Sequence, residues 1–314
     1  MPLALLVAAA ATSALDAPAA TAYQCGPGGA PDVAAKRCAC PAGKSESTDK
    51  RGTSRCLDAP RSAASSKASG AAATPRCPSD MVATPGGAFP IQGRADVSRV
   101  APFCLDKTEV SVDAFARCTA AGKCAEPDAY VERDPDPKWR IACNWKNPGR
   151  GEHPVNCLDL AQASAYCAFV GRRLPTEDEW EWAARGGDEA RSYPWGNDLP
   201  NAKRANVCGS ECAADVKARL GLDFATMPGV VDPYAQTAPV GSFPGGATRW
   251  GALDLAGNVN EWTSSTYQAG SSNVVVRGGA WDSYQYTSLF TSQRRGFPPA
   301  LKNATIGLRC AKSG

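Results

Sequence analysis

The chain has 314 residues, with 34 Lys and Arg, 31 Asp and Glu and a formal net charge of +3. A charge balance this close to neutral excludes the strongly basic footprint of a nucleic-acid-binding protein. Its 30 glycines, 25 prolines and 8 tryptophans indicate a loop-rich fold held by large aromatic side chains, not a helical bundle.

Residues 1–22 are predicted to be a signal peptide. Pro2–Ala11 is an apolar run of suitable length, and small residues suited to cleavage follow near Ala14–Ala17 and Ala20–Ala22. The residues before Cys25 do not form a lipoprotein box, so no lipid anchor is expected. No later stretch is long and apolar enough to span a bilayer. We therefore expect an exported protein that is periplasmic, displayed on the cell surface or secreted.

Residues 23–60 form a small Cys-rich segment with few large apolar residues, so they need covalent support to hold a structure. We expect two disulfides, in one of three connectivities, among Cys25, Cys38, Cys40 and Cys56. A tiny binding module is the alternative interpretation. Residues 61–76 are rich in Ser, Ala and Gly and are predicted to be a flexible linker.

The main domain is expected over residues 77–314. Residues 81–89 predict a strand, a turn and a second strand, and residues 103–110 predict a further strand. A helix is expected from Ser111, with Phe115 and Cys118 facing inward and Gly122 ending it. Residues 125–157 are irregular and rich in proline, and His153 within them is expected to be a turn residue, not a ligand.

A second helix is predicted over residues 158–170. Asp159 and Gln162 have the spacing of a capping box, in which each side chain bonds the other residue's backbone N–H. Leu160, Ala163 and Cys167 then lie on one face, so Cys167 is expected to be buried.

Residues 171–187, GRRLPTEDEWEWAARGG, predict a short amphipathic helix with defined ends. Thr176 and Glu179 form a capping box, and acidic residues in the first turn suit the positive end of the helix dipole. Trp180, Ala183 and Ala184 repeat at helical spacing and are expected to face the core. Residues 188–250, by contrast, are expected to be mostly loop.

Three further motifs follow in order: residues 257–262 (GNVNEW), 277–281 (RGGAW) and 306–310 (IGLRC). Together with residues 171–187 they closely resemble the formylglycine-generating enzyme family, also called the sulfatase-modifying-factor domain. The resemblance covers about residues 77–314. It implies an α+β, loop-rich fold related to C-type lectins, and oxidoreductase activity in the family's enzymes.

The fourteen cysteines are interpreted as disulfide partners. Their spacings form no paired CxxC motifs, and a single histidine argues against a mixed Cys/His zinc site and excludes a three-His iron site. Proximity in the sequence pairs Cys118–Cys124, Cys143–Cys157 and Cys208–Cys212, and Cys77–Cys104 would join the first strands. The resemblance implies a long-range bridge between Cys167 and Cys310.

Two structural calcium sites are expected. Asp254 and Glu261 lie in a Gly-containing turn, which suits calcium because it prefers oxygen ligands from a bent chain. The resemblance implies that both carboxylates and the carbonyls of Gly257 and Val259 hold one ion. It implies a second ion at Asn206, Val207, Asp232 and Tyr234. The alternative is that these polar residues cap turns without an ion.

The family's copper site is not expected here. Formylglycine-generating enzymes bind copper through two cysteines shortly after the RGG(S/A)W motif, and this chain has no cysteine between Cys212 and Cys310. Ser283 and Ser288 lie near the two positions, and serine is a poor ligand for Cu(I). The groove candidates are therefore Trp281, Ser283, Ser288 and Arg294, without an assigned catalytic role. Arg294 and Arg309 either bind a ligand's acidic group or pair with an acid in the core.

Two functions remain compatible with the sequence, and enzymatic activity is left open between them. The first is an exported, copper-free pseudoenzyme that binds a peptide, glycan or small ligand in the family groove. The alternative is an oxidoreductase of the same family acting in protein or siderophore maturation. A purely structural envelope protein is a third interpretation.

Overall fold

The computed structural model describes residues 74–91, 97–127 and 142–314 in full, and the backbone of short strands within residues 30–58. The chain divides into two compact units, Met1–Ala71 and Ala72–Gly314. The predicted signal peptide and the pairing of Cys25, Cys38, Cys40 and Cys56 lie outside the described residues.

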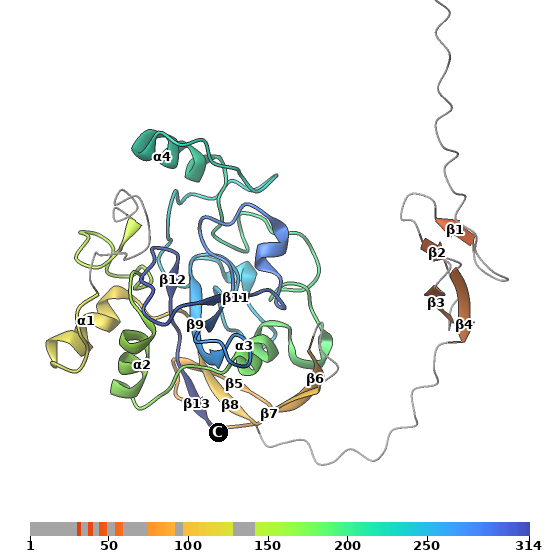
Figure 1. Cartoon of the computed structure of the whole chain (residues 1–314), viewed down its shortest axis with the longest axis horizontal. Coiled ribbons are helices and arrows are strands. Elements are labelled where there is room, and N and C mark those ends of the chain that lie inside the picture. The colour runs from red at the N-terminus through yellow and green to blue at the C-terminus, as the bar shows by residue number, and fades with distance from the viewer. Residues whose placement is uncertain are drawn as a thin grey trace, which may run out of the picture. The chain divides into compact units, whose positions relative to one another are not determined.

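The first unit contains two antiparallel hairpins (Figure 1). Strand β1 (Ala30–Asp32) pairs with β2 (Arg37–Ala39), and β3 (Lys44–Thr48) pairs with β4 (Ser54–Asp58). Short strands in a segment with few large apolar residues suit a small unit that depends on cross-links.

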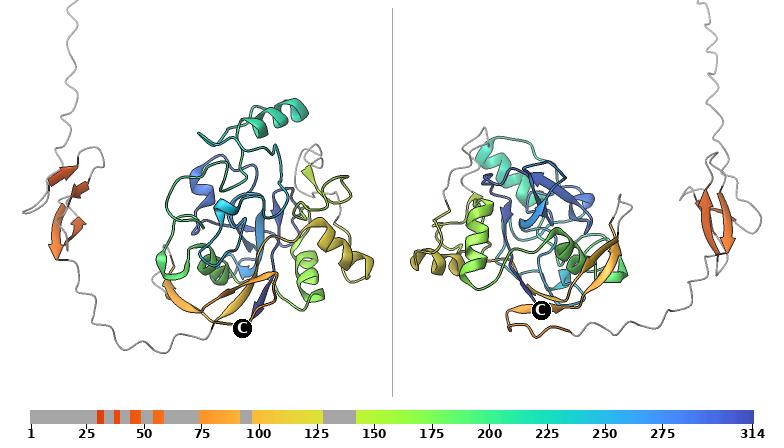
Figure 2. Two further views of the ribbon diagram at one scale, coloured as in Figure 1. Left: turned by 180° about the vertical axis from the view of Figure 1, so that it is seen from behind. Right: turned by 60° about the horizontal axis from the view of Figure 1, so that its bottom comes forward.

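The second unit opens with strands that the end of the chain completes. Strand β8 (Phe103–Asp106) lies between β5 (Met81–Thr84) and the last strand, β13 (Ala311–Ser313), with both neighbours antiparallel to it. A separate ribbon joins β6 (Gly87–Pro90) to β7 (Val97–Val100). Both views in Figure 2 show the C terminus beside these first strands.

A four-stranded sheet carries the chain's later motifs. Its order is β11-β10-β9-β12, formed by β9 (Asn260–Thr266), β10 (Val274–Arg277), β11 (Arg294–Phe297) and β12 (Ile306–Gly307). Strand β12 runs parallel to β9, whereas the other pairs are antiparallel.

The three predicted helices form with the caps expected of them. Helix α1 (Val112–Ala120) begins after Ser111, whose side chain accepts a hydrogen bond from the Ala114 N–H. Helices α2 (Leu160–Phe169) and α3 (Glu177–Ala184) both begin with complete capping boxes. Short 3-10 turns follow at η2 (Gly187–Glu189), η3 (Pro244–Gly246) and η4 (Tyr286–Leu289).

Residues 188–250 were expected to be mostly loop, and they contain one α-helix that the sequence analysis did not predict. Residues Ser210–Leu220 form helix α4, which ends at Gly221 in a left-handed conformation. Cys212, Val216 and Leu220 lie four residues apart and are buried, so this helix has an apolar face that the sequence already displayed.

Two groups of apolar residues anchor the second unit. Helices α1 and α2 pack on the four-stranded sheet through a cluster that includes Phe115, Cys167 and Trp262. Helix α3 packs on the first strands through Trp180 and Trp182. Burying large aromatic side chains in this way supplies much of the driving force for folding.

Five disulfides cross-link the second unit, and they match the five pairs predicted for it: Cys77–Cys104, Cys118–Cys124, Cys143–Cys157, Cys167–Cys310 and Cys208–Cys212. No cysteine in the described residues is free. So many bridges are typical of an oxidising compartment.

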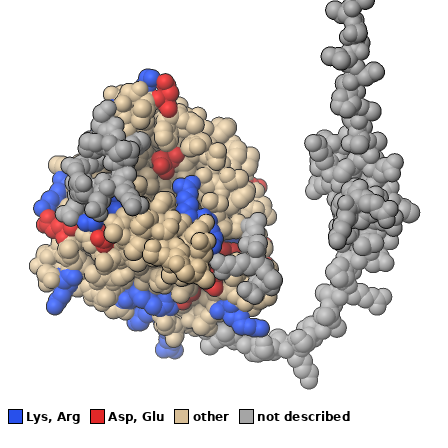
Figure 3. Space-filling model, in the orientation of Figure 1, with Lys and Arg blue, Asp and Glu red and all other residues tan. Residues whose placement is uncertain are grey.

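On the face shown in Figure 3, acidic and basic side chains are interspersed over a mostly uncharged surface. Within the described part of the chain, no helix combines the length and the apolar character that crossing a bilayer demands.

Candidate functional site

Two carboxylates on helix α3, Glu177 and Glu181, form ion pairs with arginines of the four-stranded sheet. Glu181 Oε2 accepts a hydrogen bond from Arg277 Nη2 of β10 at 2.5 Å. Glu177 forms an ion pair with Arg294 of β11, with Nε 2.5 Å from Oε1. Arg277 has no exposed side-chain surface, so its charge needs these acidic partners.

A further buried ion pair joins the motif near the C terminus to strand β9. Glu261 Oε2 accepts from Arg309 Nε at 2.8 Å and from Trp180 Nε1 at 2.7 Å. Both charged side chains are fully buried. Of the two alternatives left open for Arg294 and Arg309, the structure therefore has both pairing with an acid in the core.

Two of the groove candidates approach Gly279, Ser283 through its hydroxyl and Ser288 through its backbone carbonyl. A Cβ placed on Gly279 would lie 3.1 Å from Ser283 Oγ and 2.9 Å from the Ser288 carbonyl oxygen. Gly279 also has φ +72°, a conformation that favours glycine. Ser283 Oγ accepts a hydrogen bond from the Ala280 N–H at 3.0 Å, so this hydroxyl stabilises the turn.

Trp281, the third groove candidate, is enclosed instead of lining an open groove. Its side chain is 1% exposed, and its Nε1 donates to the Ala304 carbonyl at 3.2 Å. It belongs to an apolar cluster with Val216 and Leu220 of α4. Arg294, the fourth candidate, turns toward Glu177 on α3, so it does not join the serines in an open site.

The first set of predicted calcium ligands lies in a tightly bent segment. Asp254 has φ +58° and Gly257 has φ +86°, and both are uncommon backbone conformations. Asp254 is buried, and its Oδ2 accepts from the Gly241 N–H at 2.5 Å. Glu261 Oε1 is buried and has no hydrogen-bond partner in the described residues.

Sequence reasoning assigned no role to Glu109, a third carboxylate beside this set. Its oxygens accept from Asn258 Nδ2 at 2.6 Å and from the Val259 N–H at 3.1 Å. Burial raises the pKa of Glu109 well above its usual range, and the charges of Asp254 and Glu261 raise it further. Its sequence context, strand then Thr-Glu-Val, carried no metal signal, so only the fold could reveal it.

The second predicted set is also brought together, although Val207 and Asp232 are 25 residues apart in the sequence. Asp232 accepts from the Val207 N–H at 3.1 Å and from the Tyr234 N–H at 2.9 Å. Burial raises the pKa of Asp232 to about 6. Asn206 Oδ1 is buried without a partner among the residues described.

The two sets adjoin each other, which the sequence did not indicate. The Asn258 N–H donates to the Asn206 carbonyl at 2.9 Å, and Asn206 Nδ2 donates to Asn258 Oδ1 at 3.1 Å. A Cβ on Gly257 would come within 2.3 Å of the Asn206 carbonyl oxygen, so the close approach requires glycine.

Both sets fit a hard cation in the type of atom they offer. Each contains a buried side-chain oxygen without a partner, and calcium prefers carboxylate, amide and carbonyl oxygens. Within the described ranges, no three His, Cys, Asp or Glu side chains form a metal-binding group. An ion at either set would therefore depend on main-chain carbonyls, such as those of Gly257, Val259, Val207 and Tyr234.

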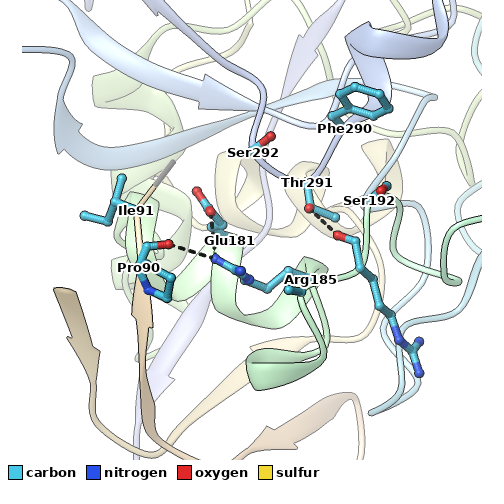
Figure 4. Close-up of a pocket in the computed structure, with 10 residues that line it drawn as sticks. Pro90, Ile91, Glu181, Arg185, Ser192, Phe290, Thr291 and Ser292 are labelled. Carbon is cyan, nitrogen blue, oxygen red and sulfur yellow. Dashed lines mark hydrogen bonds and ion pairs between the residues drawn. The ribbon is translucent and has the colours of Figure 1, made fainter. Parts of the chain in front are cut away.

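A cavity of about 380 Å³ opens beside helix α3. It is lined by α3, the end of β6, and the segments 190–192 and 290–292. Figure 4 shows Arg185 reaching from α3 to the Pro90 carbonyl and to Glu181, with Ser192, Thr291 and Ser292 on the surrounding segments. Arg185 Nε is buried and has no hydrogen-bond partner in the described residues. Sequence reasoning did not find this site, because its walls come from four separate segments.

Residues 67–314 match the family described as the sulfatase-modifying factor enzyme 1-like domain. The mouse protein named inactive C-alpha-formylglycine-generating enzyme 2 is 40% identical over 177 residues, which cover 53% of each chain. The formylglycine-generating enzyme of Streptomyces coelicolor is 31% identical over 304 residues, covering 77% of this chain and 92% of that protein. The chain thus spans about half the length of the mouse relative.

Two solved structures share the fold. The structure of PvdO from Pseudomonas aeruginosa has a TM-score of 0.55 at 23% identity and covers 78% of this chain and 99% of its own. The crystal structure of CarF has a TM-score of 0.53 at 19% identity and covers 76% and 99%. These likenesses support the loop-rich α+β architecture described above.

Proposed function

The chain belongs to the sulfatase-modifying factor enzyme 1-like domain family, and from that premise we propose that it is an exported, copper-free member that binds a ligand. One observation carries this proposal. The Ser283 hydroxyl lies beside Gly279, near where the resemblance places the copper thiolates, and it accepts a hydrogen bond from the Ala280 backbone N–H. A hydroxyl in that role is a poor ligand for Cu(I).

Two further observations support the same proposal. All ten described cysteines are in disulfides, so the described residues offer no thiolate to replace the missing pair. The mouse relative at 40% identity is itself named inactive. The five disulfides also support export, because they form and persist in oxidising compartments.

We place the ligand in the cavity beside α3 and not at Trp281, which is enclosed under α4. Arg185 contributes a buried Nε donor without a partner among the described residues. Ser192, Thr291 and Ser292 contribute polar groups to the walls. A few polar groups in a preformed cavity suit a small polar group of a peptide, glycan or other ligand.

Calcium is proposed as a structural ion at the two adjoining sets of oxygens. Asp254, Glu261 and the carbonyls of Gly257 and Val259 would hold one ion. Asn206, Val207, Asp232 and Tyr234 would hold the other. The two ions would satisfy the buried oxygens that otherwise lack a partner, and the second ion would join segment 206–207 to segment 232–234.

Oxidation within the same family is the second candidate function. The Streptomyces coelicolor relative is named formylglycine-generating enzyme and matches over 92% of its length, and this similarity favours an oxidising function. Such an activity, in protein or siderophore maturation, would need a redox centre other than the absent cysteine pair.

Anaerobic titration with Cu(I) against a chromophoric chelator tests the proposal. We expect the native protein to take no copper from the chelator. The double variant Ser283→Cys/Ser288→Cys should gain copper binding, and each single variant should gain much less, because a two-thiolate site needs both ligands. Stoichiometric copper binding by the native protein would overturn the copper-free assignment and leave oxidation as the leading function.

A further inference from the structure

A second cavity, of about 330 Å³, lies apart from the signature helix α3. It is bounded by helix α4, the turn that contains Arg150 and His153, and the segment 233–237. Its lining is strongly polar, with charged side chains from two of these three elements. None of its residues belongs to the groove candidates or to the cavity beside α3.

Arg150 brings an unneutralised positive charge to this cavity. Its Nη1 lies 3.1 Å from the Thr237 carbonyl, from Thr237 Oγ1 and from His153 Nδ1. All three are neutral acceptors, and the nearby charge of Asp215 acts on Arg150 without a hydrogen bond between them in the described residues. The other N–H groups of its guanidinium are available to donate to a further acceptor.

His153 accepts a hydrogen bond from Arg150 and carries no charge of its own at neutral pH. Burial, and then the charge of Arg150, lowers the pKa of His153 to about 4. The imidazole is therefore uncharged at neutral pH, and Nδ1 accepts from Arg150. His153 consequently positions the guanidinium without adding or removing charge.

Arg219 supplies a second guanidinium from helix α4. It forms an ion pair with Asp215 one turn earlier, with Nε 2.6 Å from Oδ1. Gln236 Nε2 donates to the other oxygen of Asp215 at 3.0 Å, which fixes this carboxylate. Both arginines line the cavity. Burial lowers the pKa of Arg150, and the charge of Arg219 lowers it further, while the charge of Asp215 acts in the opposite direction.

The charged groups that line the cavity therefore do not balance. Two arginines face one aspartate, and the histidine is neutral, which leaves a net positive charge of one in the described lining. Guanidinium groups offer paired N–H donors that match the oxygens of carboxylate, phosphate and sulfate groups. An anion between the two arginines would relieve their repulsion.

We propose that this cavity binds the oxyanion group of a small molecule, a carboxylate or a phosphate or sulfate ester, between Arg150 and Arg219. The Thr237 hydroxyl and the Gln236 amide complete the polar lining. The inference goes beyond the proposed function, because it depends neither on copper nor on the cavity beside α3.

Isothermal titration of the full chain at low ionic strength tests this site, with sulfate, inorganic phosphate and acetate as separate probes. We expect saturable binding of at least one probe, weakened about tenfold or more by Arg150→Gln and by Arg219→Gln, since each removes charge-assisted hydrogen bonds. The three probes distinguish a tetrahedral ester group from a carboxylate.

Lys217→Gln is the matched control. Lys217 lies on the same helix as Arg219, is similarly exposed, and pairs with Asp223 at 2.8 Å. Its variant should keep an affinity within about twofold of the native value, because Lys217 does not line the cavity. Arg219 is half exposed, so its variant should stay folded, and the thermal midpoint checks this.

Three results would overturn the assignment. One is that none of the three probes binds saturably at concentrations up to about 20 mM, because any affinity would then be weaker than millimolar. Another is unchanged affinity in the Arg219→Gln variant with its fold intact, since the ion would then bind elsewhere. The third is an equal loss in the Lys217→Gln variant, which would indicate only general surface charge.

Discussion

His153 shows how a single residue can be placed correctly by sequence and still have an unforeseen role. Sequence reasoning expected a turn residue, and the His153 N–H does donate to the Arg150 carbonyl in a turn. What the sequence did not indicate is the side chain's contact with Arg150 and with Thr237, which is far away along the chain.

We predict that His153 makes the domain less stable as the pH falls. Its pKa is lowered to about 4 in the folded state, against about 6.5 when unfolded. The unfolded chain therefore binds the proton first. The stability contributed by the neutral ring is present above pH 6.5 and is lost as the pH falls to about 4, by roughly 3 kcal/mol at most.

The measurement is urea unfolding of the native protein and of His153→Asn between about pH 7.5 and 4, the range that spans both pKa values. Asparagine can still accept from Arg150 but does not titrate. The difference in unfolding free energy between the two proteins should change over this range, and a constant difference would contradict the prediction. The neighbouring charges of Arg150, Arg219 and Asp215 are common to both proteins, so they do not create the difference.

For the groove candidates, the sequence showed which residue types are present but not how deeply each side chain is buried. The missing cysteines were visible in the sequence, and they exclude the family's copper ligands whatever the fold. The enclosure of Trp281 was not visible, because it depends on Val216 and Leu220 from a helix much earlier in the chain.

Helix α3 is the element that the sequence predicted best. Its capping box, its acidic first turn and its buried tryptophan are all local features, and all appear as expected. Such features form from interactions within one turn of helix, so they are readable without knowledge of the fold.

We predict that Thr176→Ala destabilises the domain by about 1 kcal/mol. The substitution removes the hydroxyl that accepts from the Glu179 N–H at 3.1 Å, leaving one donor of the first turn unsatisfied. Denaturant unfolding measures this loss, with Thr226→Ala, at an exposed threonine, as the control. Equal stability of the two variants would show that the cap contributes nothing.

Helix α4 is the element that sequence reasoning missed. Its apolar residues repeat four apart, and Gly221 follows as a stop, so the helical signal was present. The long surrounding run of Gly, Pro and Asn obscured it. This omission mattered, because α4 encloses Trp281 and supplies Arg219 to the second cavity.

At the scale of the whole molecule, distant segments converge on the proposed calcium ligands. The turn at residues 254–261 touches Asn206, and Asp232 joins the segments around Val207 and Tyr234. These loops contain little regular structure beyond α4, so an ion could hold much of the region together.

We predict that removing calcium lowers the thermal midpoint of the domain. Binding at about 100 times the dissociation constant stabilises a folded protein by about 2.7 kcal/mol per site. For a domain of this size, that corresponds to a shift of about 5–10 °C. Differential scanning calorimetry with EGTA, and then with calcium or magnesium restored, measures it.

Calcium should restore the midpoint and magnesium should not, since magnesium demands a stricter octahedral shell. An unchanged midpoint in EGTA would mean that the buried oxygens cap turns without an ion. The Asp232→Asn variant should lose part of the shift, because it weakens only one of the two sets.

The sequence by itself determined the family, the capped helices, the five disulfides of the second unit and the lack of any cysteine between Cys212 and Cys310. Most of these depend on local spacing or on residue identity, whereas the bridge between Cys167 and Cys310, 143 residues apart, was implied by the family resemblance alone. Only the tertiary structure decided that Arg294 and Arg309 pair with buried acids, that Glu109 lies beside Asp254, and that α4 closes over Trp281. Those contacts join segments that are far apart in the chain, and burial sets their charge and partners, so no local pattern encodes them.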